Sequence, residues 1–180
     1  SNAIDELPEE QLSNGVVLVG HSLGGRVAAC LGVMRSDIVK GIVFVGAPLI
    51  RYQSNAKSPL KFRLAKKFNK IGLISDTKME ENKKKYGSSD YRKASGILRE
   101  SLVKIINESY KDELSKLACP VSFLWGENDT AAPSKTAYDS EKIVSNSIGV
   151  VIISGASHDV HLENPASLKD QIEVMLKSVI

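Results

Sequence analysis

The sequence predicts an α/β fold with about four mostly parallel strands. Four short apolar runs, rich in β-branched and aromatic side chains, are each followed within two residues by a glycine. They are Val16–Val19, Ile42–Val45, Val121–Trp125 and Val150–Ile153. Continuous apolar runs of this length are typical of strands that are buried on both faces of a parallel sheet. Helical patterns separate the runs, and this alternation indicates an α/β architecture.

The flanking helices are predicted from residue spacing. One extends from Leu23 to about Met34, directly after the first strand, and a second extends from Ser134 to about Ser145. The last covers Pro165 to about Val179, and Asn164 is a suitable N-cap for it. Its apolar residues recur on one helix face: Leu168, Ile172, Met175, Leu176 and Val179. Helices that connect parallel strands form right-handed crossovers.

One long segment interrupts the alternation of strand and helix. We interpret residues 50–117 as a mostly helical cap or lid insertion, and residues 4–49 and 118–180 as the core. Within the insertion, a helical stripe precedes Leu117: Ala94, Ile97, Leu98, Leu102, Ile105 and Ile106. Residues 51–93 hold 13 of the 24 basic residues and four acidic ones, a net charge of +9. No nucleic-acid-binding motif accompanies this charge, so we expect a solvated lysine-rich face and no nucleic-acid partner.

Composition sets further limits. The chain has 180 residues, of which 42% are hydrophobic and 25% charged, which is enough apolar material for a packed core. No apolar run reaches about 18 residues, so we expect no membrane span. Cys30 and Cys119 show no metal or disulfide spacing, and we expect buried thiols in a reducing, cytoplasmic setting. Ser1-Asn2-Ala3 resembles the scar of a cleaved expression tag and is set aside.

The chemistry centres on Gly20-His21-Ser22-Leu23-Gly24-Gly25, a G-x-S-x-G pattern between a predicted strand and a predicted helix. A sharp turn here presents the Ser22 hydroxyl at the sheet edge. Gly20 and Gly24 are expected to leave room for the close approach of strand and helix. The Leu23 N–H lies at a helix N-terminus, where it can serve as an oxyanion-hole donor. The alternative is a glycine-rich turn with a capping serine.

This segment resembles the nucleophile elbow of the α/β-hydrolase superfamily, particularly of serine esterases and lipases. In that family an acid follows a later strand, and a histidine follows the last strand. The sequence Gly126-Glu127-Asn128-Asp129-Thr130-Ala131-Ala132-Pro133 resembles the family's G-x-x-D-x-x-x-P loop. The resemblance makes Asp129 the acid that orients the histidine. Glu127 is the alternative acid, and Asp129 as a turn former or helix cap is the structural alternative.

The segment after the last predicted strand resembles the family's G-x-x-H-x-x-x-x-E-x-P ending. In Gly155-Ala156-Ser157-His158-Asp159-Val160-His161-Leu162-Glu163-Asn164-Pro165, His158 takes the position of the base. His161 misses the spacing and is interpreted as a surface or supporting residue. His21 is expected to pack beside the elbow without a catalytic role.

The resemblance implies a serine hydrolase that cleaves an ester or thioester by two-step acyl transfer, with no cofactor or metal. Two alternatives remain open. One is a related chemistry on the same triad, either cofactor-free peroxidase activity or carbon–carbon bond hydrolysis. The other is a non-enzymatic binding fragment.

The sequence departs from the family in one respect. The elbow follows the first visible strand, whereas the family places about four strands before it. The family's loop with the second oxyanion donor is therefore missing, and one lost donor typically costs on the order of 10²–10³ in rate. We expect the chain alone to have weak or no hydrolase activity. We also expect a homodimer or larger assembly that covers the exposed edge of the first strand.

Overall fold

A computed structural model describes residues 8, 12–51, 75 and 95–179. The chain divides into two compact units. The sheet unit comprises Ser1–Ile50 and Ser109–Ile180, and the inserted unit comprises Arg51–Glu108. The expected insertion also covered residues 109–117, which the structure places with the sheet unit. Most of the lysine-rich segment, residues 51–93, lies outside the described residues.

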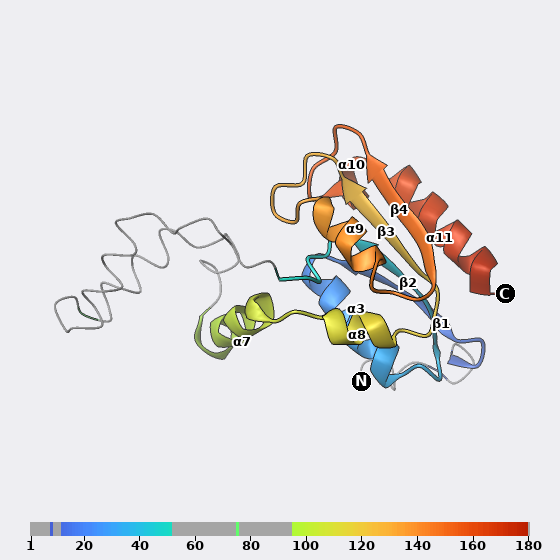
Figure 1. Cartoon of the computed structure of the whole chain (residues 1–180), viewed down its shortest axis with the longest axis horizontal. Coiled ribbons are helices and arrows are strands. Elements are labelled where there is room, and N and C mark those ends of the chain that lie inside the picture. The colour runs from blue at the N-terminus through green and yellow to red at the C-terminus, as the bar shows by residue number, and fades with distance from the viewer. Residues whose placement is uncertain (1–7, 9–11, 52–74, 76–94, 180) are drawn as a thin grey trace. The chain divides into compact units, whose positions relative to one another are not determined.

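The sheet has four parallel strands in the order β1-β2-β3-β4. They are β1 (Val16–His21), β2 (Val39–Val45), β3 (Val121–Gly126) and β4 (Ser147–Ile153). All strands therefore end at the same edge, and the loops that follow them meet there (Figure 1). The predicted α/β fold with a parallel sheet is confirmed.

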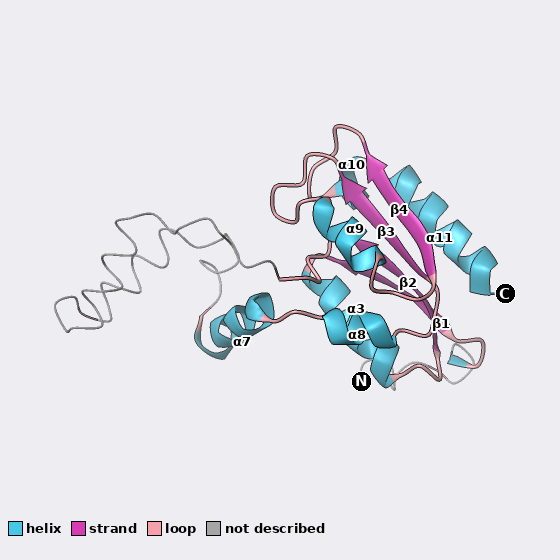
Figure 2. Ribbon diagram, viewed as in Figure 1, coloured by secondary structure: helices cyan, strands magenta, loops and turns pink. Residues whose placement is uncertain are grey.

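Helices cover both faces of the sheet (Figure 2). On one face lie α3 (Leu23–Met34), α8 (Lys111–Lys116) and α9 (Lys135–Glu141). On the other lie α10 (Val160–Glu163) and α11 (Pro165–Val179). This two-sided covering explains why the central strands are apolar at successive positions.

Two hydrophobic clusters hold the layers together. Alternate strand residues belong to different clusters, since successive side chains point to opposite faces. Phe44 and Phe123 stack at 5.4 Å between ring centroids on the face of α3. Val43 and Leu124 pack on the other face against Met175 of α11. The core thus fixes the carboxyl ends of β2 and β3.

The helical pattern predicted to continue to about Leu117 forms two helices, and the described residues of its apolar stripe all lie in the first of them. The helix α7 (Gly96–Asn107) belongs to the inserted unit and α8 to the sheet unit. The chain is extended at Glu108, between the two helices, with φ −84° and ψ 156°. Leu114 of α8 is fully buried in the core, so this helix is part of the sheet unit by packing.

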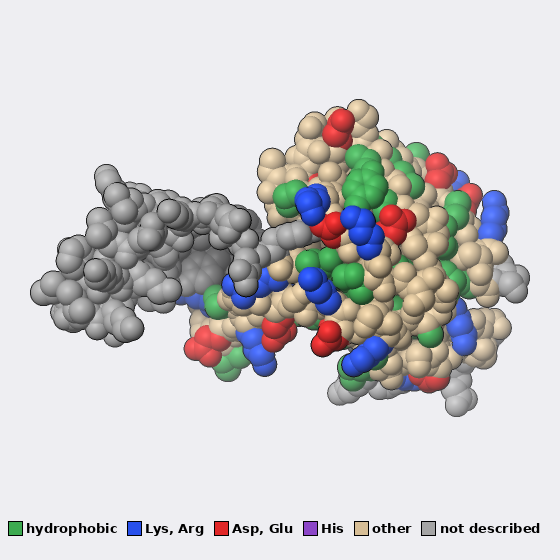
Figure 3. Space-filling model, viewed as in Figure 1, with side chains coloured by type: hydrophobic (Ala, Val, Ile, Leu, Met, Phe, Trp, Pro, Cys, Tyr) green, Lys and Arg blue, Asp and Glu red, His purple; other side chains and the backbone are tan. Residues whose placement is uncertain are grey.

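Apolar side chains occur in separate small groups among basic and acidic ones on the face seen in Figure 3. Cys30 and Cys119 are not joined in a disulfide and are half-buried, rather than fully buried as expected. Among the described residues, no helix combines the length and apolar character that a membrane crossing requires.

Candidate active site

Ser22 stands between β1 and α3 in a strained backbone conformation. Its φ of 51° and ψ of −115° make it the one non-glycine residue with positive φ among those described. Such conformations cost about 1–3 kcal/mol and persist where surrounding structure enforces them. The Ser22 N–H donates to the carbonyl of Val45 at 2.9 Å, which anchors the turn to β2.

The close approach of strand and helix depends on Gly20 and Gly25. A Cβ on Gly20 would lie 2.6 Å from the Gly25 Cα, and one on Gly25 would lie 2.3 Å from the Ala47 Cβ. A Cβ on Gly24 would meet nothing within 4 Å. The expectation that Gly24 makes room for this approach is therefore wrong. The side chain of Gly24 would face away from the sheet, whereas that of Gly25 would face it.

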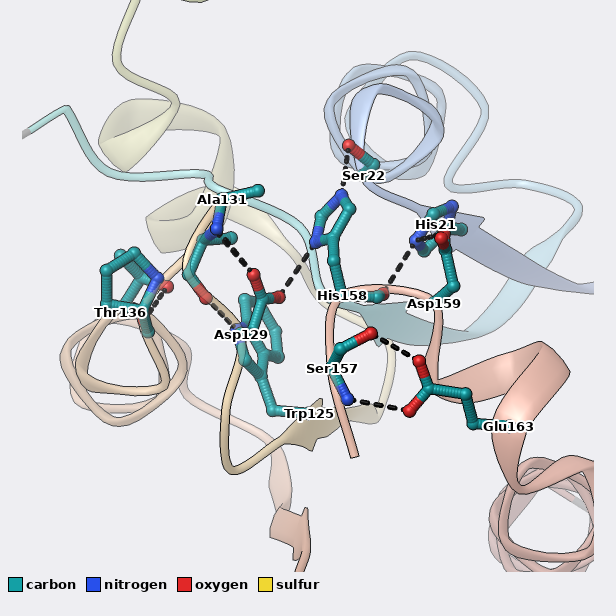
Figure 4. A network of polar contacts seen from close by, with 12 residues as sticks. His21, Ser22, Trp125, Asp129, Ala131, Thr136, Ser157, His158, Asp159 and Glu163 are labelled. Carbon is teal, nitrogen blue, oxygen red and sulfur yellow. Dashed lines mark hydrogen bonds and ion pairs between the residues drawn. The ribbon is translucent and has the colours of Figure 1, made fainter. Parts of the chain in front are cut away.

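Asp129 lies in the loop after β3 and is buried. Its Oδ1 accepts the N–H groups of Ala131 at 2.9 Å and Ala132 at 2.7 Å. The Trp125 indole Nε1–H donates to the Ala132 carbonyl at 2.6 Å and ties the loop to β3. These bonds fix the carboxylate so that its second oxygen faces His158 (Figure 4).

His158 joins Asp129 to Ser22. Its Nδ1 lies 2.8 Å from Asp129 Oδ2, and its Nε2 lies 3.1 Å from Ser22 Oγ. A carboxylate accepts hydrogen bonds only, so Nδ1 carries the proton in this arrangement. The Nε2 lone pair then faces the Ser22 hydroxyl. The structure thus brings together the three residues that the sequence singled out.

Two carboxylates secure the loop that carries His158. Glu127 accepts the Gly155 N–H at 2.9 Å and the Ser154 hydroxyl at 2.8 Å, and these bonds lower the pKa of Glu127. Glu163 accepts the Ser157 N–H at 2.7 Å and the Ser157 hydroxyl, and its pKa is lowered as well. Glu127, the alternative acid, thus bonds the loop and not the His158 ring.

Sequence reasoning missed Gly46. This residue follows β2 with φ of 51°, and a Cβ there would lie 3.3 Å from both Asp129 Oδ2 and His158 Nδ1. A side chain here would press on the Asp129–His158 pair, and the positive φ disfavours any residue but glycine as well. The signal in the sequence was a glycine directly after an apolar run, which says nothing about the neighbours that the fold supplies.

Two further histidines lie beside His158. The His21 Nε2 is 3.1 Å from the His158 carbonyl oxygen, a distance at which it donates. Burial lowers the pKa of His21, so its ring is neutral at neutral pH. His161 packs on His21 with ring centroids 4.2 Å apart. His21 therefore packs beside the elbow, as expected.

The Leu23 N–H is the one oxyanion donor that the sequence suggested. Leu23 is the first residue of α3, so its N–H belongs to the first helical turn, whose donors have no partner within the helix. It directly follows Ser22. An anionic oxygen formed at a carbonyl that Ser22 attacks would develop near this donor.

Comparison with known proteins agrees with the parallel α/β fold. The alpha/beta hydrolase family model matches residues 1–171. The mouse (Mus musculus) monoglyceride lipase is 25% identical over an alignment of 174 residues, which covers 90% of this chain and 57% of that protein. The chain thus spans little more than half the length of this curated relative.

Solved structures share the fold at low sequence identity. A lipase-esterase related protein from Clostridium acetobutylicum ATCC 824 superposes with a TM-score of 0.67 and 16% identity, over 97% of this chain and 71% of that one. A meta-cleavage product hydrolase from Pseudomonas fluorescens IP01 superposes with a TM-score of 0.59 and 13% identity, over 91% of this chain and 65% of that one. From its strand order and this family match, the chain belongs to the alpha/beta hydrolase family.

Proposed function

We propose that this chain carries the site of a serine hydrolase that cleaves an ester or thioester by two-step acyl transfer. One observation carries the proposal: an unbroken hydrogen-bonded line from Ser22 through His158 to Asp129. Ser22 is the nucleophile, His158 the base and Asp129 the acid. The same three residue types serve acyl transfer on unrelated folds, where geometry defines their roles.

In the first step, His158 Nε2 takes the Ser22 hydroxyl proton as Oγ attacks the carbonyl carbon. A tetrahedral intermediate forms, and its oxyanion accepts a hydrogen bond from the Leu23 N–H. The protonated His158 then gives its proton to the leaving alcohol or thiol, and an acyl-enzyme remains. Asp129 stabilises the imidazolium without taking its proton.

In the second step, water releases the acyl group. His158 takes a proton from the water, whose oxygen attacks the acyl carbonyl. Collapse of the second intermediate breaks the bond to Ser22 Oγ, and His158 returns the proton to Ser22. Both steps use the three side chains, the Leu23 N–H and water, and with a single oxyanion donor we expect turnover by this chain to be weak or absent.

The choice of substrate to test first follows from the relatives. The mouse relative is a monoglyceride lipase, so monoacylglycerol esters lead the panel, followed by simple esters and thioesters. The superposed meta-cleavage product hydrolase supports a second candidate, carbon–carbon bond hydrolysis on the same three residues. A diketone-like substrate in the same panel distinguishes the two.

The test is labelling with a fluorescent phosphonate, which reports an activated serine without requiring turnover. We expect wild-type protein to be labelled and both Ser22→Ala and His158→Ala to lose labelling. Ser134→Ala is the matched control, because the Ser134 side chain makes no capping hydrogen bond at α9, and it should be labelled like wild type. Labelling of Ser22→Ala, or none in a folded wild type, would contradict the proposal.

A further inference from the structure

A cluster of potential metal ligands lies beside the proposed active site. The His21 cluster comprises His21 at the end of β1, Asp159 just before α10 and His161 within it. Each offers one ligand atom, and these atoms all lie within 4.8 Å of one another. His21 Nε2 lies 3.8 Å from Asp159 Oδ1, and the mechanism proposed above uses none of these side chains as acid, base or nucleophile.

His161 supplies a second, independent observation. Its Nδ1 is buried and makes no hydrogen bond to any part of the chain that the structure describes. A buried polar atom without a partner is costly, and an ion is one of the few features that account for it. The ring is held in this place by packing against His21.

The ligand set suits a divalent transition metal. Two imidazoles and one carboxylate are ligands of zinc, which binds them at about 2.0–2.2 Å. Tetrahedral coordination at that length separates neighbouring ligand atoms by about 3.3–3.6 Å. The cluster must contract to reach this spacing, and the Asp159 side chain, which is 58% exposed, has the freedom to move inward.

We propose that His21, Asp159 and His161 form a binding site for a divalent transition-metal ion of the Zn²⁺ type. The ion has three protein ligands, and water completes its coordination. The site is distinct from the Ser22–His158–Asp129 line but adjoins it, since Asp159 follows His158 directly.

Occupancy of this site opposes the present hydrogen bond to His158. The His21 Nε2 is the ring nitrogen that lies 3.8 Å from Asp159 Oδ1, and we assign it as the ligand atom. It either donates a proton to the His158 carbonyl or gives its lone pair to a metal ion, because a ring nitrogen cannot do both. Metal binding therefore releases the His158 backbone from His21. Resting on the function proposed above, we infer that the bound ion slows the reaction at Ser22.

Zn²⁺ titration by calorimetry tests the site directly. The chain, free of any polyhistidine tag, should bind one Zn²⁺ saturably, and both Asp159→Asn and His161→Ala should weaken binding at least about 10-fold. His158→Ala is the matched control, because it removes the remaining histidine and leaves the cluster in place. Circular dichroism confirms that each variant is folded, and the exposed Asp159 side chain makes its substitution safe for the core.

Three results would each overturn the site. The first is the absence of saturable binding by wild type at millimolar Zn²⁺, and the second is wild-type affinity in both cluster variants. The third is loss of binding in His158→Ala, which would place the ion at the proposed active site instead. None of these readouts depends on hydrolase activity, so failure of the site and failure of the proposed function are separable.

The effect on Ser22 is measured by phosphonate labelling. Saturating Zn²⁺ should slow labelling of wild type, a chelator should restore it, and Asp159→Asn should be insensitive at the same concentration. An unchanged labelling rate in Zn²⁺-saturated wild type would overturn the inferred coupling.

Discussion

At the scale of single residues, Asp129 shows how the fold prepares a polar group for chemistry. Its two carboxylate oxygens have separate partners: two backbone N–H groups hold Oδ1, and His158 takes Oδ2. The carboxylate cannot rotate without losing bonds that a buried acceptor needs. The position of the His158 ring, and so its distance from Ser22, follows from this constraint.

Gly46 leads to a prediction about this arrangement. Gly46→Ala should slow phosphonate labelling at least about 10-fold, because its Cβ would meet Asp129 Oδ2 and His158 Nδ1 at 3.3 Å. A left-handed conformation also costs a non-glycine residue about 1–2 kcal/mol, which lowers the melting temperature by several degrees in a chain of this size. Gly24→Ala is the control for stability, since its Cβ meets nothing and its melting temperature should not fall. Wild-type labelling by Gly46→Ala would show that the pair tolerates the added methyl group.

At the scale of elements, the loops after β3 and β4 are joined into one support. Glu127 bonds Ser154 and Gly155, and the Asn128 N–H donates to the Ala156 carbonyl at 2.8 Å. The loop with the acid and the loop with the base are thus held together beyond the Asp129–His158 contact. Loss of the Glu127 charge should loosen this support.

The Glu127 brace predicts a dependence on pH. The Gly155 N–H, and then the Ser154 hydroxyl, lower the pKa of Glu127 below its ordinary value of 4.5. A lowered carboxyl pKa in the folded state stabilises the fold above pH 4.5, and this stabilisation is lost as pH falls through the folded-state pKa. Glu127→Gln should therefore melt below wild type near neutral pH, and the difference should shrink in acid.

Thermal melts across pH 3–8 measure this difference. Glu173→Gln is the matched control, because within the described part of the chain the exposed Glu173 forms a surface ion pair with Lys169 and braces no loop. A difference in melting temperature between wild type and Glu127→Gln that persists unchanged in acid would contradict the role assigned to the Glu127 carboxylate.

The sequence predicted elements well where their signal is local. Apolar runs identified all four strands, but β2 begins at Val39, earlier than the predicted Ile42. Lys40 and Gly41 interrupt the apolar pattern there, and pairing with β1 extends the strand through them. Likewise β4 begins at Ser147, where pairing with β3 overrides weak strand propensity.

The residues of the site also differ in whether a local sequence signal reveals them. Ser22, Asp129 and His158 were recognisable because each follows a strand in a short motif, and parallel strands bring such loops to one edge. Gly46 and the buried Nδ1 of His161 were not recognisable from the sequence. The importance of Gly46 depends on neighbours more than 80 residues away in the chain, and that of His161 depends on its burial. Motifs reveal the reacting groups, and only the fold reveals what surrounds them.

At the scale of the whole molecule, the edge strand β1 suggests self-association. Among the described residues, β1 pairs with β2 alone, and its Val19 is 45% exposed, whereas the apolar residues of β2 are buried. An apolar strand with an open edge favours pairing with another chain. We propose that this 180-residue chain forms a homodimer or larger assembly through that edge. Light scattering at micromolar concentration should give the mass of at least two copies, and a strictly monomeric mass would contradict this.

The sheet unit should fold and keep its site without the inserted unit. The Tyr110 N–H donates to the Leu49 carbonyl at 2.9 Å, so the two ends of the sheet unit that flank the insertion are already adjacent. Residues 51–108 can therefore be replaced by a short glycine–serine linker without stretching the core. The sheet unit should still unfold cooperatively and should still label at Ser22, because the described site residues all belong to it.

The shortened chain should differ from the full chain in its selectivity. We expect the inserted unit, Arg51–Glu108, to set the preference among acyl groups, so its removal should flatten the ranking of phosphonates with short and long alkyl chains. Ile97 and Leu98 of α7 are 82% and 68% exposed and are the apolar side chains to substitute next, as Ile97→Ser and Leu98→Ser in the full chain. A ranking that survives the deletion would locate selectivity in the sheet unit, and a shortened chain that is folded but unlabelled would show that Ser22 needs the insertion to react.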